Sequence, residues 1–364
     1  MSGSIRQHRL KNFWDVTYDP EISLDDFQSW DVADLNLNGK NNSGPRKVAI
    51  DLTTPTLYTP GTKLILAKKN VSLYENKQFS GYIFTECDIF GDNKGKRITF
   101  KDCEFRKVCF GYSNLSNVKF TNCKFKQCSF SMANFENCQF NNCQYEKISY
   151  SGNETKFLNT YIDAQKIVKA LFINTNKDIC DKEGTTPEYQ VFRSYGTKTK
   201  FSKIILNSLS TIPDDDAYYK AVKTHSQCKQ KSKKENIKFK IERSGILKNI
   251  MQYPWLLSSI IESAIVNASG SVNGWGGSLF KCILIGLLIT IAFACCYFTF
   301  FNVPILNSLI MSLDITLLAG YTKHATNIIS PAKQIVYLIN MIIGLWWYGI
   351  LIPTLINKIC TSRT

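Results

Sequence analysis

The sequence predicts a mixed fold: a repetitive middle, a basic helical region and an all-α membrane domain of two spans with a re-entrant pore loop. Three observations predict it. Large apolar residues recur at every fifth position, cations gather beyond the repeats, and two windows of 20 and 22 residues carry no charge. These features divide the chain into an N-terminal cap region (1–70), the repeats (71–164), a basic helical linker with a ligand-sensing role (165–250), and an interfacial helix plus the two-span pore domain (251–364).

The N-terminal region gives two expectations. The stretch "DLTTPTLYTPGTKLILA" (51–67) is expected to form short strands that cap the repeats. The first residues, "MSGSIRQHRLKNFWDV", lack the apolar core of a secretory signal peptide. The chain up to the first charge-free window is therefore expected in the cytosol, and its cysteines are expected to be reduced thiols.

The middle of the chain repeats with a period of five. Each large apolar residue follows a smaller one by two positions, and this period belongs neither to an α-helix nor to a plain strand. The pattern starts earlier, at Phe79, and loses register across Gly91–Arg97, which is expected to be an inserted loop. The large residues of the continuous run are Phe100, Phe105, Phe110, Leu115, Phe120, Phe125, Phe130, Phe135, Phe140, Tyr145 and Tyr150.

Over about 71–164 this pattern resembles the pentapeptide-repeat family. The resemblance implies a short right-handed quadrilateral β-helix, in which the large residue and its smaller partner both point inward and coils stack about 4.8 Å apart. Cys103, Cys123 and Cys143 would then form one inward column. They are expected to be small core residues rather than a metal or redox site, because their spacing follows the repeat and not a zinc pattern. Cys109, which lies outside the inward register, is a candidate reactive thiol.

The charge of the repeats excludes one function. Some members of that family are acidic mimics of DNA, but the run from Ile98 to Tyr150 has seven Lys and Arg against four Asp and Glu. A rod with this net positive charge cannot imitate a phosphate backbone. The repeats are therefore expected to be a rigid spacer or a docking surface.

Cations are concentrated between Ala217 and Lys248, with ten Lys and Arg against two Asp and Glu. Two interpretations remain open. The segment is either a solvated linker or a polybasic segment that lies against anionic lipid, or it is a binding site for a nucleotide or oligonucleotide, with Tyr218, Tyr219 and Phe239 available for stacking. The candidate polyanion-binding residues are Lys220, Lys223, Lys229, Lys231, Lys233, Lys234, Lys238, Lys240 and Arg243. No phosphate loop, metal pattern or catalytic motif is present, so neither a cofactor nor an enzymatic activity is predicted.

The C-terminal region predicts three helices that meet the membrane. Pro254–Val266 is too short to span a bilayer and is expected to lie at its surface, with a plain core helix as the alternative. The charge-free windows Cys282–Phe301 and Ile335–Ile356 are each long enough to cross a hydrocarbon core of about 30 Å. Flanking cations favour both termini in the cytoplasm, with three outside the hairpin against two within it.

The hairpin between the spans has an apolar half-helix, about Ile305–Leu317, followed by an extended turn. This layout resembles the pore superfamily of potassium channels, and "LLAGYTK" is similar to that family's T-V-G-Y-G-D filter at its glycine and tyrosine. The second filter glycine and the acidic residue are replaced, so the resemblance implies a pore without potassium selectivity. The candidate pore residues are Leu318, Ala319, Gly320, Tyr321, Thr322, Lys323 and His324, and the candidate gating hinges are Gly344, Gly349 and Pro353.

Two spans cannot enclose a pore alone, and the pore resemblance implies a cyclic tetramer. Four basic segments would gather a net charge of about +32, which favours gating by an anionic ligand. A cytosolic sensor joined to a two-span pore also resembles the membrane effectors of bacterial antiphage defence, which arrest growth from the inner membrane. The expected partners are further copies of the chain, the lipid bilayer, a nucleotide or oligonucleotide and the enzyme that makes it. The alternative is a membrane-tethered scaffold whose repeats dock a partner protein.

Overall fold

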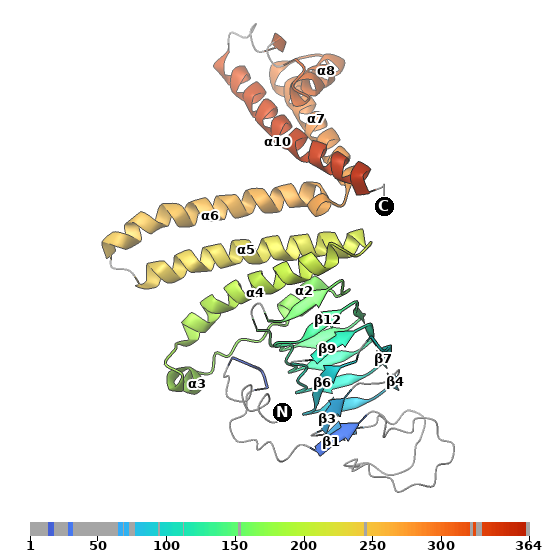
Figure 1. Ribbon diagram of the computed structural model, residues 1–364. Coiled ribbons are helices and arrows are strands. Elements are labelled where there is room, and N and C mark those ends of the chain that lie inside the picture. Colours follow the sequence, from blue (N-terminus) through green and yellow to red (C-terminus); the bar gives the residue numbers. More distant parts are fainter. Residues whose placement is uncertain are drawn as a thin grey trace. The chain divides into compact units, whose positions relative to one another are not determined.

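The computed structural model describes residues 14–17, 28–31, 65–67, 69–72, 77–93, 95–111, 113–151, 154–243, 246–320, 323–324 and 330–361. The chain forms two compact units, Met1–Ser259 and Ile260–Thr364. The first is a β-solenoid with helices at its C-terminal end, and the second is helical (Figure 1).

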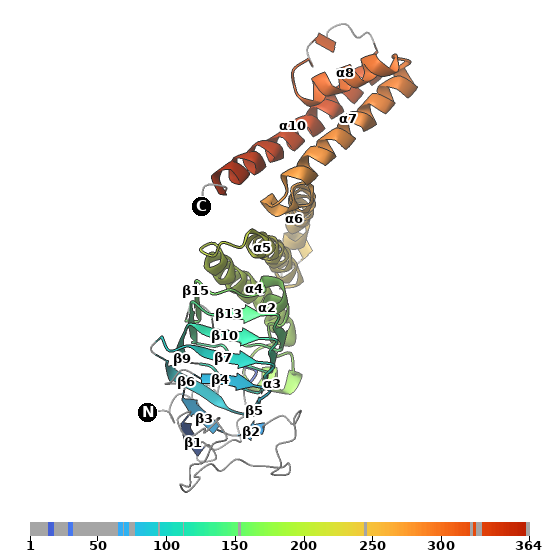
Figure 2. The same cartoon turned by 90° about the vertical axis from the view of Figure 1, so that its right-hand side faces the viewer.

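The solenoid has about four turns. Three of its sides are all-parallel sheets (Figures 1 and 2), and the fourth is a column of isolated bridges through Asp88, Cys109, Ser129 and Ser149. The first sheet has the order β1 (Gln28–Asp31), β3 (Lys69–Ser72), β6 (Asp88–Asp92), β9 (Ser113–Ser116), β12 (Asn134–Glu136) and β15 (Lys156–Leu158). The second contains β4 (Lys77–Ser80), β7 (Ile98–Lys101), β10 (Val118–Thr121) and β13 (Gln139–Asn141). The third contains β2 (Ile65–Ala67), β5 (Ile83–Thr85), β8 (Glu104–Arg106), β11 (Lys124–Lys126) and β14 (Gln144–Glu146).

The strand register confirms the predicted coil length. Phe100 lies beside Phe120, and Phe120 beside Phe140, so one coil takes four pentapeptides. Across 91–97 the coil is longer, because Phe79 pairs with Phe100 rather than with Thr99. The predicted insertion is therefore present. The strand β2 lies at the end of the stretch 51–67, where short capping strands were predicted, and pairs with β5, whereas residues 51–64 lie outside the described residues. The strand β1 pairs with β3.

The solenoid core consists of the predicted inward residues. Phenylalanine rings stack from coil to coil in columns, and in one of them Phe79, Phe100, Phe120 and Phe140 have centroid separations of 4.8, 5.1 and 4.6 Å. All four side chains are at most 1% exposed. Because parallel coils bring equivalent residues into line, one apolar choice repeated once in every coil produces a continuous stack.

The corners of the coils require a left-handed backbone two residues after the central residue. Asn117, Asn122, Asn137, Asn142 and Asn159 occupy such corners, with φ between 45° and 60°. Asparagine adopts this conformation more readily than most residues with a side chain. It also links coils, since Asn142 Nδ2 donates to Asn122 Oδ1 at 2.9 Å. The polar residues between the phenylalanines thus provide both the turn and a bond to the next coil.

A short N-terminal segment covers the fourth side of the solenoid. The Asp15 carboxylate is 1% exposed and accepts hydrogen bonds from Ser129 Oγ at 2.6 Å and Ser131 Oγ at 3.0 Å. It also accepts from the backbone N–H and the hydroxyl of Thr17, at 2.9 and 2.8 Å. Within the described residues, these four donors satisfy the buried carboxylate and no cation pairs with it. The small residues of this side leave room for the segment.

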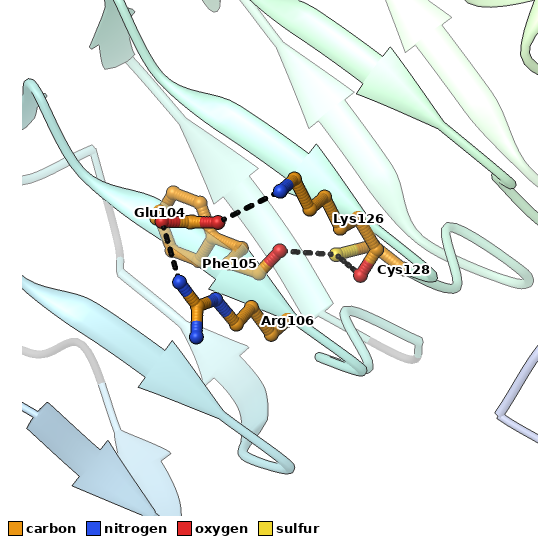
Figure 3. Close-up of polar contacts among 5 residues, drawn as sticks. All are labelled: Glu104, Phe105, Arg106, Lys126 and Cys128. Atoms are coloured by element: carbon orange, nitrogen blue, oxygen red, sulfur yellow. Dashed lines mark hydrogen bonds and ion pairs between the residues drawn. The ribbon is translucent and has the colours of Figure 1, made fainter.

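The outer surface of the third sheet has a partly buried ion cluster. Glu104 Oε2 accepts from Arg106 at 3.0 Å, and Oε1 lies 3.3 Å from Lys126 Nζ on the next coil (Figure 3). The Glu104 side chain is 8% exposed, whereas both cations are about half exposed. The hydrogen bond from Arg106 is the main reason that the pKa of Glu104 is lowered.

We expect the Glu104 carboxylate to stabilise the solenoid above the unfolded-state pKa of about 4.3, and we expect this contribution to be lost as the pH falls through the lower folded-state pKa. Glu104→Gln should reduce the free energy of unfolding by about 1 kcal/mol at pH 7, since the cations are screened by solvent. Thermal unfolding of the full chain at pH 7 and pH 3.5 measures this. The exposed Glu136→Gln is the control, and an equal loss for Glu104→Gln at both pH values would contradict the charge interaction.

Four helices follow the solenoid: α2 (Ala164–Lys169), α3 (Lys177–Lys182), α4 (Pro187–Leu209) and α5 (Asp215–Arg243). Phe201 of α4 closes the end of the core, with its ring 4.4 Å from that of Tyr150. The Ser208 hydroxyl donates to the Thr160 carbonyl at 3.0 Å and accepts from its N–H at 2.8 Å. The helix α5 packs along α4. The solenoid and this helical pair therefore share one continuous core.

The second unit begins within α6 (Ile246–Val272), which contains the predicted interfacial segment and has Pro254 inside it. After η3 (Gly274–Gly276) come α7 (Leu279–Phe301), α8 (Ile305–Thr316) and α10 (Pro331–Thr361). The helix α7 and the segment Pro331–Ile359 of α10 are long and apolar enough to span a membrane. The exposure of Leu287 and Leu288 at 55%, and of Ile342 at 53%, is typical of helices that face lipid.

Candidate functional site

The short helix α8 packs between the two long helices through small polar residues. Ser312 is fully buried, and its Oγ donates to the Thr290 carbonyl at 2.7 Å, at the middle of α7. Ser308, one turn earlier on the same side, is also fully buried. The opposite side of α8 is apolar and exposed, with Leu306 at 66%. The predicted apolar half-helix thus exists, and its polar stripe binds it to α7.

A buried hydrogen-bond chain fixes the C-terminal end of α8. Thr316 Oγ1 donates to Asn340 Oδ1 at 3.0 Å, and Asn340 Nδ2 donates to the Tyr297 hydroxyl at 2.8 Å. Tyr297 and Asn340 are fully buried and Thr316 is 1% exposed. One residue comes from each of α7, α8 and α10. A polar chain in the middle of apolar helices is costly unless it is satisfied, and such residues commonly mark functional positions.

Two glycines allow the helices to approach closely. A Cβ on Gly344 of α10 would lie 2.5 Å from the Thr316 carbonyl oxygen, so the end of α8 rests on the backbone of α10. Gly286 of α7 faces the Trp347 ring with equally little room for a side chain. A Cβ on Gly349 would meet nothing within 4 Å. Gly344 is therefore a close helix contact, and Gly344, Gly349 and Pro353 all remain predictions as hinges.

The turn after α8 differs from the extended filter that was expected. Leu318 is left-handed at φ 62°, its N–H donates to the Ile315 carbonyl, and the Ala319 N–H donates to the Asp314 carbonyl at 2.8 Å. The Gly320 N–H donates to the same carbonyl at 3.1 Å. This is a compact C-terminal cap, and it arises because the free carbonyls of a helix end are satisfied locally. The expectation of an extended turn is wrong for 318–320, and Tyr321 and Thr322 lie outside the described residues.

Asp314 is a residue that the motif comparison missed. Its Oδ2 lies 3.2 Å from His324 Nε2, and it is the only acidic residue between Asn302 and Gln334. A single acidic residue within an apolar segment is the feature of the sequence that could have identified Asp314 as a candidate functional residue. His324 is half-buried and Lys323 is exposed. The Asp314 carboxylate therefore places a negative charge beside His324.

A comparison with known families identifies the repeats. A family model described as pentapeptide repeats matches residues 113–144 in eight copies. This segment consists of pentapeptide repeats. No curated protein and no solved structure matches the chain. The pentapeptide solenoid continues beyond the matched segment on both sides, because its strand pairing runs from β1 to β15.

The cysteines of the pentapeptide solenoid are core residues. The thiols of Cys103, Cys123 and Cys143 form the predicted column, and each lies within 3.7 Å of a carbonyl oxygen of the preceding coil. Burial raises the pKa of Cys128 to about 12. Cys109 is only 4% exposed, so the solenoid side does not present it as a reactive thiol. Among the described residues, no cluster of His, Cys, Asp and Glu is arranged to hold a metal ion.

The basic segment forms most of α5, beyond the C-terminal end of the pentapeptide solenoid. Lys234 and Lys238 are half-buried, and Lys238 pairs with Glu235 at 3.0 Å. Phe239 stacks on Phe192 of α4 at 4.6 Å, which covers one face of its ring. The Arg243 side chain lies outside the described residues. The exposed predicted lysines are Lys220, Lys223, Lys229, Lys231, Lys233 and Lys240.

Proposed function

We propose that the chain assembles into a homotetrameric, poorly selective ion channel, with the pentapeptide solenoid and the α4–α5 pair as its cytosolic regulatory part. One observation supports this most strongly. Thr316 at the end of α8 is bonded to Asn340 and lies against Gly344, the tenth and fourteenth residues of α10, so α8 folds back alongside two helices that are long enough to span a membrane.

The position of this reversal favours an assembly over a single tether. A tether needs only a polar loop at the membrane surface. Backbone outside a helix is tolerated at bilayer depth only where protein covers it or water reaches it. Leu318–Gly320 satisfies part of its backbone through the Asp314 carbonyl. Neighbouring copies around an aqueous path would satisfy the rest, and the apolar side of α8 offers them a contact surface.

The same segment supports weak selectivity. A potassium filter needs an extended row of carbonyls, whereas Leu318–Gly320 turns its N–H groups back into the helix end. Lys323 adds an exposed cation nearby. We therefore infer a conduit that passes small ions with less than about tenfold preference for potassium over sodium, which corresponds to about 1.4 kcal/mol.

The regulatory part supports control by an anionic ligand. The basic helix α5 lies on α4, and α4 closes the solenoid core, so a ligand on these helices acts on one rigid body. A nucleotide or oligonucleotide signal and a growth-arrest role in bacterial antiphage defence follow by analogy with membrane effectors of similar organisation. In this proposal the bilayer is the bacterial inner membrane, both termini are cytoplasmic, and the enzyme that makes the ligand is the functional partner.

Reconstitution tests the channel directly. Full-length protein in detergent should have the mass of four chains, and liposomes containing it should lose an imposed potassium gradient, as read by a potential-sensitive dye. Protein-free liposomes are the control. A monomer in detergent, together with liposomes that stay electrically tight at every ligand concentration tested, would contradict the channel and favour the membrane-tethered scaffold.

A further inference from the structure

The lysines of α5 fall into two separate rows. The first row has Lys220, Lys223, Lys231, Lys234 and Lys238, with Gln227 between the second and third lysines. Consecutive members are three or four residues apart, so all six lie on one side of the helix. The second row, on another side of the helix, has Lys229, Lys233 and Lys240.

The helix α4 adds one cation to each row, Lys198 beside the first and Lys203 beside the second. Lys198 is half-buried, and its Nζ lies 5.8 Å from the centre of the Tyr195 ring. Burial is the main cause that lowers the pKa of Lys198; the Cys228 side chain raises it in part, and the ammonium of Lys231 lowers it further. In the part of the chain that the structure describes, neither Lys198 nor Lys231 forms an ion pair with a carboxylate. Within the described residues, these two ammonium groups at the α4–α5 boundary therefore have no carboxylate partner.

The second row is in a different environment. Lys229 and Lys203 lie near His225, and the pKa of His225 is lowered by burial first and then by these cations. The ring is also held by Ser202, whose Oγ lies 3.1 Å from His225 Nδ1. This side therefore ends in a histidine that packs between the helices. The first row contains no histidine, although Gln227 stands within it and its last lysine, Lys238, pairs with Glu235 at 3.0 Å.

The length and chemistry of the first row define a ligand class. From Lys220 to Lys238 the row extends about 27 Å at the rise of an α-helix. Lysine ammonium groups are point charges that bind phosphate oxygens in many orientations. A single nucleotide would reach only a fraction of the row. We propose that the first row and Lys198 form a binding surface for a linear, phosphate-bearing polyanion that lies along α5.

This inference rests on the proposed function only where it makes the polyanion the ligand that gates the channel. Binding of the polyanion can be measured whether or not the protein conducts ions. Two probes separate the sources of a phosphate chain: inorganic polyphosphate and a fluorescein-labelled oligothymidylate. The full-length protein in detergent is titrated by anisotropy with the oligothymidylate and by calorimetry with polyphosphate. Stronger binding of polyphosphate would assign a phosphoanhydride chain, and stronger binding of the oligothymidylate would assign an oligonucleotide.

Two triple variants carry the same change in charge on the same helix. Lys223→Glu with Lys231→Glu and Lys234→Glu alters the first row, and Lys229→Glu with Lys233→Glu and Lys240→Glu alters the second. We expect the first variant to bind at least tenfold more weakly and the second to change less than threefold. Near-equal losses of polyanion affinity in the two variants, or binding of the protein only to phosphatidylglycerol vesicles, would contradict the proposed binding surface. Melting temperatures identify a variant that misfolds, and in that case Lys198→Gln with Lys231→Gln replaces the triple change.

The two proposals fail in different ways. If the first-row variant loses polyanion binding while its liposomes still conduct without regulation, the proposed binding surface and the proposed channel are both supported. If the variant loses binding as expected but neither it nor the wild-type protein conducts, the binding surface is supported and the channel proposal is wrong. If the variant binds the polyanion normally while its ion flux is abolished, the proposed binding surface is wrong.

Discussion

Gly344→Ala is expected to displace α8 and abolish ion flux. The added methyl group would lie 2.5 Å from the Thr316 carbonyl oxygen and 2.8 Å from the Thr316 Cα, so backbone rather than a flexible side chain must move. Overpacking of this kind costs about 3 kcal/mol. The movement would also separate Thr316 from Asn340, which are 3.0 Å apart, and so break the buried chain to Tyr297.

Gly349→Ala provides a matched control on the same helix. A Cβ at Gly349 meets nothing within 4 Å, and alanine in a helix is more favourable than glycine by about 1 kcal/mol. Gly344→Ala should therefore lower both the melting temperature in detergent and the ion flux of liposomes, whereas Gly349→Ala should maintain both. Equal, normal flux from both variants would show that conduction does not depend on the contact between α8 and α10. Loss of flux in both would instead favour a hinge at Gly349.

The repeats were predictable because each coil imposes the same demand on the same position. Phe120 has the same kind of neighbours as Phe100 and Phe140, so equivalent positions of successive coils select the same type of side chain. The period of five in the sequence therefore reveals the repeat before the fold is known. The two long helices were predictable for a similar reason. An apolar window of about 20 residues has few stable environments other than a bilayer or the core of a large protein.

The contacts within the helical unit depend on single residues that no period indicates. Nothing in the sequence pairs Thr316 with Asn340 or places Gly344 against a carbonyl oxygen. The end of α8 was misread because "LLAGY" was compared with a filter, whereas the bonds to the Asp314 carbonyl make 318–320 a helix cap. Hydrogen bonding of the free backbone groups at the helix end determines the conformation of 318–320, and the short sequence similarity to a filter does not.

The N-terminal contact had the same character. Asp15 is an ordinary acidic residue in the sequence, and its partners Ser129 and Ser131 are far away along the chain. The rows on α5 were recoverable in principle, because helical spacing alone separates Lys231 from Lys233. The position of Lys198 beside Lys231 required the packing of α4 against α5, since the two residues belong to different helices.

The second large effect is expected from Phe120→Ala in the pentapeptide solenoid. Phe120 is fully buried, and its ring stacks between those of Phe100 and Phe140 at interplanar angles of 6° and 13°. Removing a buried phenylalanine side chain costs about 3–5 kcal/mol, and the surrounding rings cannot close the gap because the coils hold their backbones in register. Since each coil contacts only its neighbours, the cavity also uncouples the two halves of the stack.

Phe120→Leu separates the cavity from the loss of the aromatic ring. Leucine keeps the position apolar and most of its volume, so the variant should lose only about 1 kcal/mol of the free energy of unfolding. Chemical denaturation of the full chain, followed by circular dichroism of the β-structure, measures both variants. The expected order is wild type, then leucine, then alanine, with the largest step at alanine. Similar losses for leucine and alanine would mean that ring stacking, and not filled volume, holds successive coils together.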